Sequence, residues 1–207
     1  MIVLSLDTTG QTCSVSLVDE ARVRAHISKN IGRGHAEVLA GMVAEAFDHA
    51  GLTPKDVDRL AVCTGPGSFT GLRVALSFAK GFALPRNLPI VGIDALAITA
   101  ATQQVSGAGV ISVYRDIRRG EVFYGEFSNG YPMGEVRAMP RAEMERLNDL
   151  VQFDLVESTN IDTRILGWLA MERDPENCPA EPLYSRGPDA KLPGDKSPPI
   201  SLTAKKP

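Results

Sequence analysis

The residues best placed to do chemistry in this chain lie in one glycine-rich stretch, Gly65-Pro66-Gly67-Ser68-Phe69-Thr70-Gly71-Leu72-Arg73. It follows a short apolar run, 60–63, and leads into a segment, 72–84, that is apolar on most sides. Ser68 or Thr70 can cap a helix whose first backbone N–H groups point outward, and such a helix start can bind phosphate. The same glycines equally suit a tight strand-to-helix turn with close packing. Both interpretations stay open.

Two common nucleotide motifs are absent from this stretch. A P-loop requires a lysine directly after its second glycine, and none follows here. The dinucleotide fingerprint requires a glycine at its sixth position, where Thr70 stands. The spacing of the glycines therefore identifies no standard nucleotide site.

The three histidines do not form a recognisable metal or catalytic motif. His26, His35 and His49 are nine and fourteen positions apart, and no ordered set of acidic residues accompanies them. A peptidase needs a nucleophile, a base and an orienting acid, and no histidine follows Ser68 along the chain. We expect three surface histidines, no metal site and no catalytic residue.

Length and composition limit the kind of protein this can be. The chain has 207 residues, enough for one large domain or two small lobes, and a net charge of -3. This charge disfavours a stand-alone nucleic-acid binder. Three widely spaced cysteines suit a reducing compartment. There is no signal-peptide pattern and no apolar run long enough to cross a membrane, so we expect a cytoplasmic protein.

The N-terminal third predicts one half of an actin-like ATPase fold. Apolar or alternating runs at 2–6, 13–18 and 23–27 indicate three strands, and a helix follows them. In that fold the first turn, here Asp7-Thr8-Thr9, reaches towards phosphate or metal. A turn closed by hydrogen bonds from side chains to the backbone is the simpler interpretation, and the residues alone favour it.

Two helices dominate the first half of the chain. The helix over 36–50 is amphipathic and ends at Gly51, which is typical of a helix C-terminus. A line of small side chains on it would let another helix approach closely. It equally suits a plain core helix with a solvated alanine face, and the residues alone favour this second interpretation. The helix over 72–84 carries one narrow polar stripe. The small line consists of Ala36, Ala40 and Ala44, and the polar stripe of Arg73, Ser77 and Lys80.

The second half begins with a hairpin that repeats the first. Strands at 110–114 and 121–127 flank a turn, and Asp116 stands where Asp7 stands in the first hairpin. This pattern agrees with an internal duplication. Arg115, Arg118 and Arg119 gather positive charge there, either as a solvated turn or as a contact to phosphate or RNA.

Less regular sequence follows this hairpin. We predict a helix over 142–150, a strand over 153–157 and a helix over 161–171. The proline-rich end should lack regular structure. We therefore divide the chain into a first lobe (1–105), a reduced second lobe (106–186) and a loosely held tail (187–207).

The stretch 65–73 resembles the signature of the bacterial TsaB family. At position 117 that family usually has Ala, and Ile stands here. The family is the non-catalytic subunit of the machinery that forms threonylcarbamoyladenosine in tRNA, and it was once grouped with the glycoproteases. The resemblance covers nearly the whole chain through four further stretches: Leu4-Ser5-Leu6-Asp7-Thr8-Thr9, Pro89-Ile90-Val91-Gly92-Ile93, Asp116-Ile117-Arg118-Arg119-Gly120-Glu121-Val122-Phe123 and Glu181-Pro182-Leu183-Tyr184-Ser185-Arg186.

The resemblance implies an α/β, actin-like (ASKHA) fold of two lobes with a reduced second lobe. It implies an accessory subunit that dimerises with the catalytic TsaD subunit, works with the TsaE ATPase, and depends on TsaC for threonylcarbamoyl-adenylate. Transfer RNA is reached only through the complex, and the chain alone should form a homodimer. No cofactor is implied, although a vestigial ATP or ADP contact stays open at six residues: Asp7, Thr8, Thr9, Gly65, Gly67 and Ser68.

The resemblance also assigns the partner surface to helices 36–50 and 71–84. In the catalytic paralogue a His-x-x-x-His metal pair follows the strand equivalent to 90–93, and residues 94–100 here contain no histidine. The alternatives are a small ATP-dependent kinase or peptidase of the same fold, and a self-associating scaffold. The predicted interface residues are Ala36, Leu39, Ala40, Val43, Ala44, Phe47, Arg73, Leu76, Ser77 and Lys80.

Overall fold

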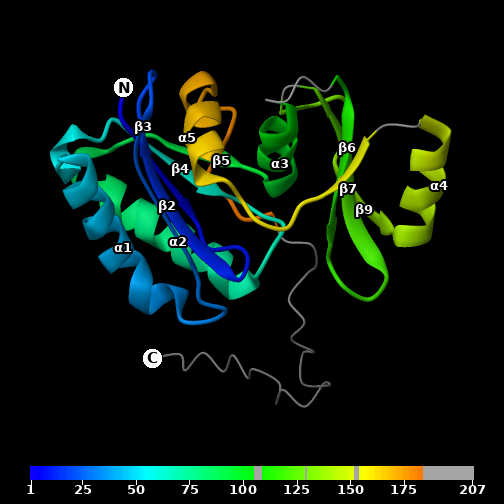
Figure 1. Ribbon diagram of the computed structural model, residues 1–207, viewed down its shortest axis with the longest axis horizontal. Helices are drawn as coiled ribbons and strands as arrows, with labels where there is room; N and C mark the ends of the chain where they lie inside the picture. The colour runs from blue at the N-terminus through cyan, green and yellow to red at the C-terminus, as the bar shows by residue number, and fades with distance from the viewer. Residues whose placement is uncertain (105–108, 129, 152–153, 184–207) are drawn as a thin grey trace, which may run out of the picture.

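The structure is a computed structural model, and it describes residues 1–104, 109–128, 130–151 and 154–183. Two five-stranded sheets form two lobes, with helix α3 between them (Figure 1). This architecture confirms the predicted α/β, actin-like fold with a reduced second lobe.

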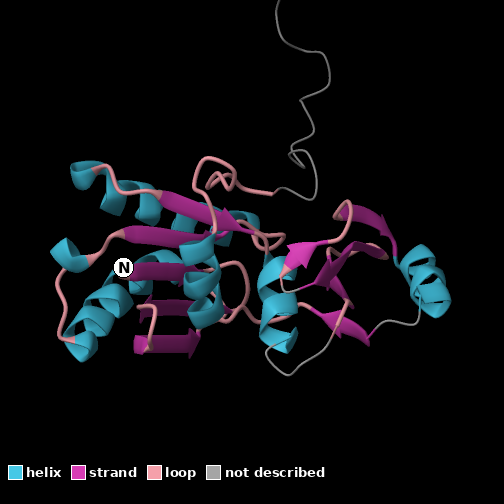
Figure 2. Ribbon diagram, turned by 90° about the horizontal axis from the view of Figure 1, so that it is seen from above, coloured by secondary structure: helices cyan, strands magenta, loops and turns pink. Residues whose placement is uncertain are grey.

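The first sheet consists of β1 (Val3–Asp7), β2 (Thr12–Val18), β3 (Val23–Asn30), β4 (Arg59–Cys63) and β5 (Ile90–Ile93). Its strand order is β3-β2-β1-β4-β5 (Figure 2). β2 is antiparallel to both β1 and β3, whereas β4 is parallel to β1 and to β5. The strands predicted at 2–6, 13–18 and 23–27 correspond to β1, β2 and β3.

Helices α1 (His35–Ala50) and α2 (Phe69–Ala83) cover one face of this sheet (Figure 1). Gly51 ends α1 in the left-handed conformation, with φ of 63°, as its position predicted. Ser68 begins α2 as its N-cap, because its hydroxyl accepts a hydrogen bond from the Gly71 N–H. Phe82 stacks with Phe47 of α1 and with Phe78, so aromatic contacts join the two helices.

The second sheet has strand order β10-β6-β7-β8, and β9 also pairs with β7. The core between the lobes is continuous, because α3 (Ala95–Gln104) contacts β6, β7 and α5. The small helix α4 (Arg141–Val151) packs on the far side of this sheet through Met144. The strands are β6 (Ile111–Asp116), β7 (Glu121–Ser128), β8 (Tyr131–Pro132), β9 (Arg137–Pro140) and β10 (Asp154–Glu157).

The last helix, α5 (Thr163–Glu172), packs on the first sheet, on the face opposite α1 and α2. The indole N–H of Trp168 donates to the Asp19 carbonyl at 3.0 Å, and the Ser5 hydroxyl donates to the Thr163 carbonyl at 2.6 Å. The prediction that residues 106–186 all belong to the second lobe is therefore wrong for α5. The exposed face of the parallel strands needs an apolar cover, and α5 supplies it.

The end of the described chain runs back to the glycine-rich turn. The Leu183 N–H donates to the Thr64 carbonyl at 2.8 Å, and the Gly92 N–H donates to the Cys178 carbonyl at 2.9 Å. The described chain is therefore docked on the first lobe as far as Leu183. The predicted boundary at 106 and the tail 187–207 lie outside the described residues. None of the described helices is long and apolar enough to cross a membrane.

Candidate functional site

The turn at the end of β1 is joined to the glycine-rich turn by a set of short hydrogen bonds. The Thr8 hydroxyl donates to the Gly71 carbonyl at 2.6 Å, and the Ser68 N–H donates to the Thr9 carbonyl at 2.8 Å. The Thr9 N–H donates to the Asp7 carboxylate at 3.1 Å. The predicted turn closed by side-chain hydrogen bonds is thus observed, because Asp7 accepts from the backbone two residues on.

The glycines in this region allow close approach of two backbone segments. A Cβ on Gly71 would overlap the Thr8 carbonyl, and one on Gly67 would lie 2.7 Å from the Thr9 carbonyl oxygen. The Ser68 and Gly71 N–H groups are already hydrogen-bonded within the chain. The geometry therefore favours the packing interpretation of the glycines, and a vestigial phosphate contact remains a prediction.

Beneath this turn lies a small set of buried polar side chains. Asp7, Cys63 and Arg115 are all buried, and Arg115 reaches there from β6 of the second lobe. Burial raises the pKa of Asp7, while the bond from Thr9 and the Arg115 charge oppose that rise. Burial also raises the pKa of the Cys63 thiol, so this cysteine is not a reactive thiolate.

The turn around Asp116 differs from its counterpart at Asp7. The Asp116 side chain is exposed and accepts hydrogen bonds from the Arg118 N–H at 2.6 Å and from Arg141 at 2.8 Å, which lower its pKa. Arg118 and Arg119 lie on the exposed turn with positive φ. Arg115 is buried, so the prediction that all three arginines gather at this turn is wrong. Successive side chains of a strand point to opposite faces of the sheet, and the side chain of Arg115 on β6 points towards the first lobe.

The predicted partner surface divides into an exposed and a buried set. The buried side chains form the core between the helices and the sheet and therefore leave little surface for a partner. The exposed members remain a prediction. The buried set is Leu39, Val43, Phe47 and Leu76, and the exposed set is Ala36, Ala40, Ala44, Arg73, Ser77 and Lys80.

A pocket of about 570 Å³ opens between α1 and α2, at the end where both helices begin. Arg73 lies over the Phe69 ring at 3.9 Å. Phe69 is 48% exposed and Leu84, just past α2, is 80% exposed. Both residues lie at helical spacing from Arg73 and Lys80, which places them on the same face as the predicted polar stripe. The lining residues are Ala36, Leu39, Phe69, Thr70, Arg73, Val74, Ser77 and Phe78.

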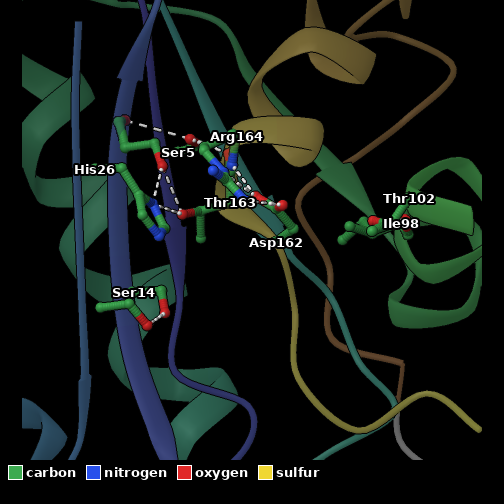
Figure 3. A network of polar contacts seen from close by, with 10 residues as sticks. Ser5, Ser14, His26, Ile98, Thr102, Asp162, Thr163 and Arg164 are labelled. Carbon is green, nitrogen blue, oxygen red and sulfur yellow. Dashed lines mark hydrogen bonds and ion pairs between the residues drawn. The ribbon is translucent and has the colours of Figure 1, made fainter. Parts of the chain in front are cut away.

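His26 takes part in a polar network below α5 (Figure 3). Its Nδ1 lies 2.8 Å from the Ser16 hydroxyl and 3.4 Å from the Thr163 hydroxyl. Ser16 is fully buried and also bonds Thr163, so this serine cannot reach a substrate. Asp162 is held by Arg164, which donates to both carboxylate oxygens. The Ser–His pair in this network is therefore structural.

We expect the stability of the protein to fall as the pH drops below about 6.5. Burial lowers the pKa of His26, and the Arg164 charge lowers it further while Asp162 opposes this. Because the unfolded chain binds the proton more readily, stability is present above the unfolded pKa and is lost as the pH falls towards the folded pKa. Melting temperatures of the wild type and His26→Gln at about pH 8 and 5.5 check this. Equal pH dependence in both proteins would contradict it.

Among the residues that the structure describes, no three His, Cys, Asp or Glu side chains gather closely enough to hold a metal ion. His26 and His49 are exposed, and His35 is half-buried at the start of α1. The predicted surface position therefore holds for two of the three histidines.

The comparisons with known proteins decide the family. The TsaD family model, described as tRNA N6-adenosine threonylcarbamoyltransferase, matches residues 23–165. The chain belongs to this TsaD family. The matched region contains both α1 and α2, together with the second-lobe hairpin.

The curated relatives of this TsaD-family chain carry the TsaB name. It is 34% identical over 139 residues to the tRNA threonylcarbamoyladenosine biosynthesis protein TsaB of Escherichia coli (strain K12), covering 65% of this chain and 60% of that protein. It is 30% identical over 132 residues to the protein of that name from Bacillus subtilis (strain 168), covering 63% and 57%. The chain thus matches a little over half the length of these relatives.

Two solved structures match nearly nine tenths of this chain. A Pseudomonas aeruginosa protein, described as having similarity to the peptidase YEAZ, superposes with a TM-score of 0.74 at 27% identity. The match covers 89% of this chain and 99% of that chain. YeaZ from the same organism gives a TM-score of 0.71 at 26% identity, covering 88% and 99%. The two-lobed fold is therefore common to this chain and to YeaZ.

Proposed function

We propose that this chain is a non-catalytic subunit of a complex that forms N6-threonylcarbamoyladenosine in tRNA. It pairs with the catalytic TsaD subunit, which modifies the adenosine adjacent to the anticodon. The names of the curated TsaB relatives support the pathway, and membership of the TsaD family supports the partner, because related subunits commonly pair through equivalent surfaces.

The observation that carries this proposal is the exposed face of α1 and α2. Ala36, Ala40 and Ala44 lie on the exposed side of α1, and Gly41 and Gly81 have no neighbouring atom within 4 Å of an added Cβ. Small side chains on two adjacent helices allow a second helix pair to pack closely. A face of this kind serves a protein partner better than a small substrate.

The remaining partners belong to the same proposal. The TsaE ATPase joins the complex, tRNA is bound only through the assembled complex, and the chain alone forms a homodimer in the cytoplasm. The chain needs no metal or cofactor of its own. A vestigial ATP or ADP contact would form only at the complex interface.

We expect the chain to co-purify with the TsaD subunit as a stable complex, read from its mass. Adding the chain to TsaD, TsaE and the enzyme that supplies threonylcarbamoyl-adenylate should raise tRNA modification. A control mixture without the chain gives the background. If the chain alone hydrolysed ATP or peptides, and did not bind TsaD, the kinase or peptidase alternative would replace this proposal.

A further inference from the structure

The second sheet has an open edge along β10. Among the described strands, β10 (Asp154–Glu157) pairs only with β6, to which it is parallel. The Ser158 N–H donates to the Tyr114 carbonyl on β6 at 2.7 Å, so the backbone groups of Glu157 and Leu155 point the other way by alternation. Backbone groups that point away from a sheet edge can accept a further strand.

Exposed apolar side chains lie beside this edge. Leu155 is 38% exposed, and Leu150 and Val151 at the end of α4 are 80% and 37% exposed. Two residues, 152 and 153, separate α4 from β10 along the chain, so we treat these three side chains and β10 as one surface, the β10 edge surface. Figure 1 shows α4 at the end of the molecule opposite α1, so this surface is distinct from the face of α1 and α2.

The charges around the β10 edge surface are mostly negative. Between positions 142 and 157 the sequence has five acidic residues and one basic residue. All five acidic residues are exposed, and two of them, Asp149 and Asp154, flank the apolar group along the chain. An occupant of this surface should therefore be basic as well as apolar. The acidic residues are Glu143, Glu145, Asp149, Asp154 and Glu157.

One segment of the chain itself has these properties, in the part that lies outside the described residues. Ile200-Ser201-Leu202-Thr203 alternates apolar and polar side chains, which is the period of a strand, and its four residues match the length of β10. Between 196 and 207 there are three lysines and no acidic residue. Two of these, Lys205 and Lys206, come just after the alternating run.

The chain is long enough to bring this run to β10. The described part ends at Leu183, whose N–H is bonded to the Thr64 carbonyl on the first lobe. Sixteen residues, 184–199, follow before the run begins, and fully extended they span about 50 Å. A compact chain of 207 residues has a radius of gyration of about 17 Å, so the run can reach the second lobe of the same molecule.

We propose that residues 200–203 pair with β10 of the same molecule as a short antiparallel strand. This inference is independent of the proposed function, and it gives four residues of the predicted loose tail a fixed place. The antiparallel direction brings Lys205 and Lys206 beside Asp154 at the start of β10, where opposite charges attract. The added strand covers an edge that could otherwise pair with another chain.

Side-chain alternation sets the register of this strand. When Leu202 lies opposite Leu155, Ile200 lies opposite Glu157, and both apolar side chains point to the face that carries Leu155. A shift by one residue would turn both of them away from that face. In the favoured register the outward N–H groups of Leu155 and Glu157 donate to the added strand.

Hydrogen exchange of single amides, followed by NMR in the full chain, tests this pairing. We expect the Leu155 and Glu157 amides to exchange at least about tenfold more slowly in the wild type than in Leu202→Asp. Leu192→Asp is the matched control, because it changes a leucine of the same tail outside the run, and it should exchange like the wild type. The Val113 amide on β6 should be equally protected in every variant, which verifies that the lobe remains folded.

A second variant addresses the charges. Lys205→Glu combined with Lys206→Glu should speed exchange of the same two amides at low salt, because the glutamates would repel Asp154. Unchanged exchange in this double variant would overturn the antiparallel direction.

The remaining outcomes decide whether the run occupies the edge at all. Equal exchange rates in the wild type and Leu202→Asp would overturn the inference. Protection that rises with protein concentration, together with the mass of a dimer, would assign the edge to the tail of a second copy and overturn pairing within one molecule.

Discussion

Ala40→Glu is expected to abolish stable pairing with the TsaD subunit while the isolated chain remains folded. Ala40 is exposed on α1 and belongs to the line of small residues. An unpaired carboxylate buried in an interface costs about 3–5 kcal/mol, and each 1.4 kcal/mol corresponds to about tenfold in affinity. We therefore expect the dissociation constant to rise by at least about a hundredfold. Calorimetric titration with TsaD and tRNA modification in the reconstituted mixture measure the loss.

Two control variants identify the cause of any loss. Ala142→Glu adds the same charge at an exposed position of α4 and should change neither binding nor stability. Ala46→Glu places it at a fully buried position of α1 and should unfold the chain. A folded Ala40→Glu protein that supports normal tRNA modification would contradict the assignment of this face. Unfolding of Ala40→Glu itself would place Ala40 in the core.

The regular elements of the first lobe could be predicted because local signals agree there. Gly51 ends α1 and Ser68 begins α2, as the capping rules require. The run at 90–93 is a strand with the predicted bounds. Strands and helices of this kind are set mostly by apolar periodicity, and periodicity can be counted from the sequence.

The position of α5 could not be predicted from its own sequence. Its apolar residues indicate a helix that needs a partner, but they do not say which sheet it covers. The answer depends on the bonds from Ser5 and Trp168 that link residues more than a hundred positions apart. Strands β8 and β9 were also missed, because β8 has only two residues and β9 has one buried residue among four, so neither shows an apolar pattern.

Which residues of α1 and α2 are exposed could be predicted only in part, for a related reason. Leu39 and Val43 each follow an exposed alanine by three positions, yet both side chains are buried against the sheet. Sequence spacing shows that a line of small residues exists, but only the packed structure shows which neighbours are covered. Nothing in the sequence indicates that Phe69 is exposed, because large apolar residues are more often buried.

Gly71→Ala, in the first turn of α2, is expected to destabilise the isolated chain. In Gly71→Ala the new methyl group would overlap the Thr8 carbonyl, which belongs to the backbone and cannot rotate away. Forcing the helix away from the first turn should cost about 3 kcal/mol or more. For a chain of this size that lowers the melting temperature by about 6–12 °C. Thermal unfolding followed by circular dichroism measures the change.

Gly81→Ala is the matched control on the same helix. An added Cβ at Gly81 meets no atom within 4 Å, and alanine favours a helix over glycine by about 1 kcal/mol. This variant should therefore melt about 2–4 °C above the wild type. Opposite shifts for two identical substitutions would show that Gly71 is required for backbone packing and not for helix geometry. If the glycine turn instead served phosphate, the Gly71→Ala chain would melt like the wild type and lose only a stabilisation by added ATP, and the packing interpretation would then be wrong.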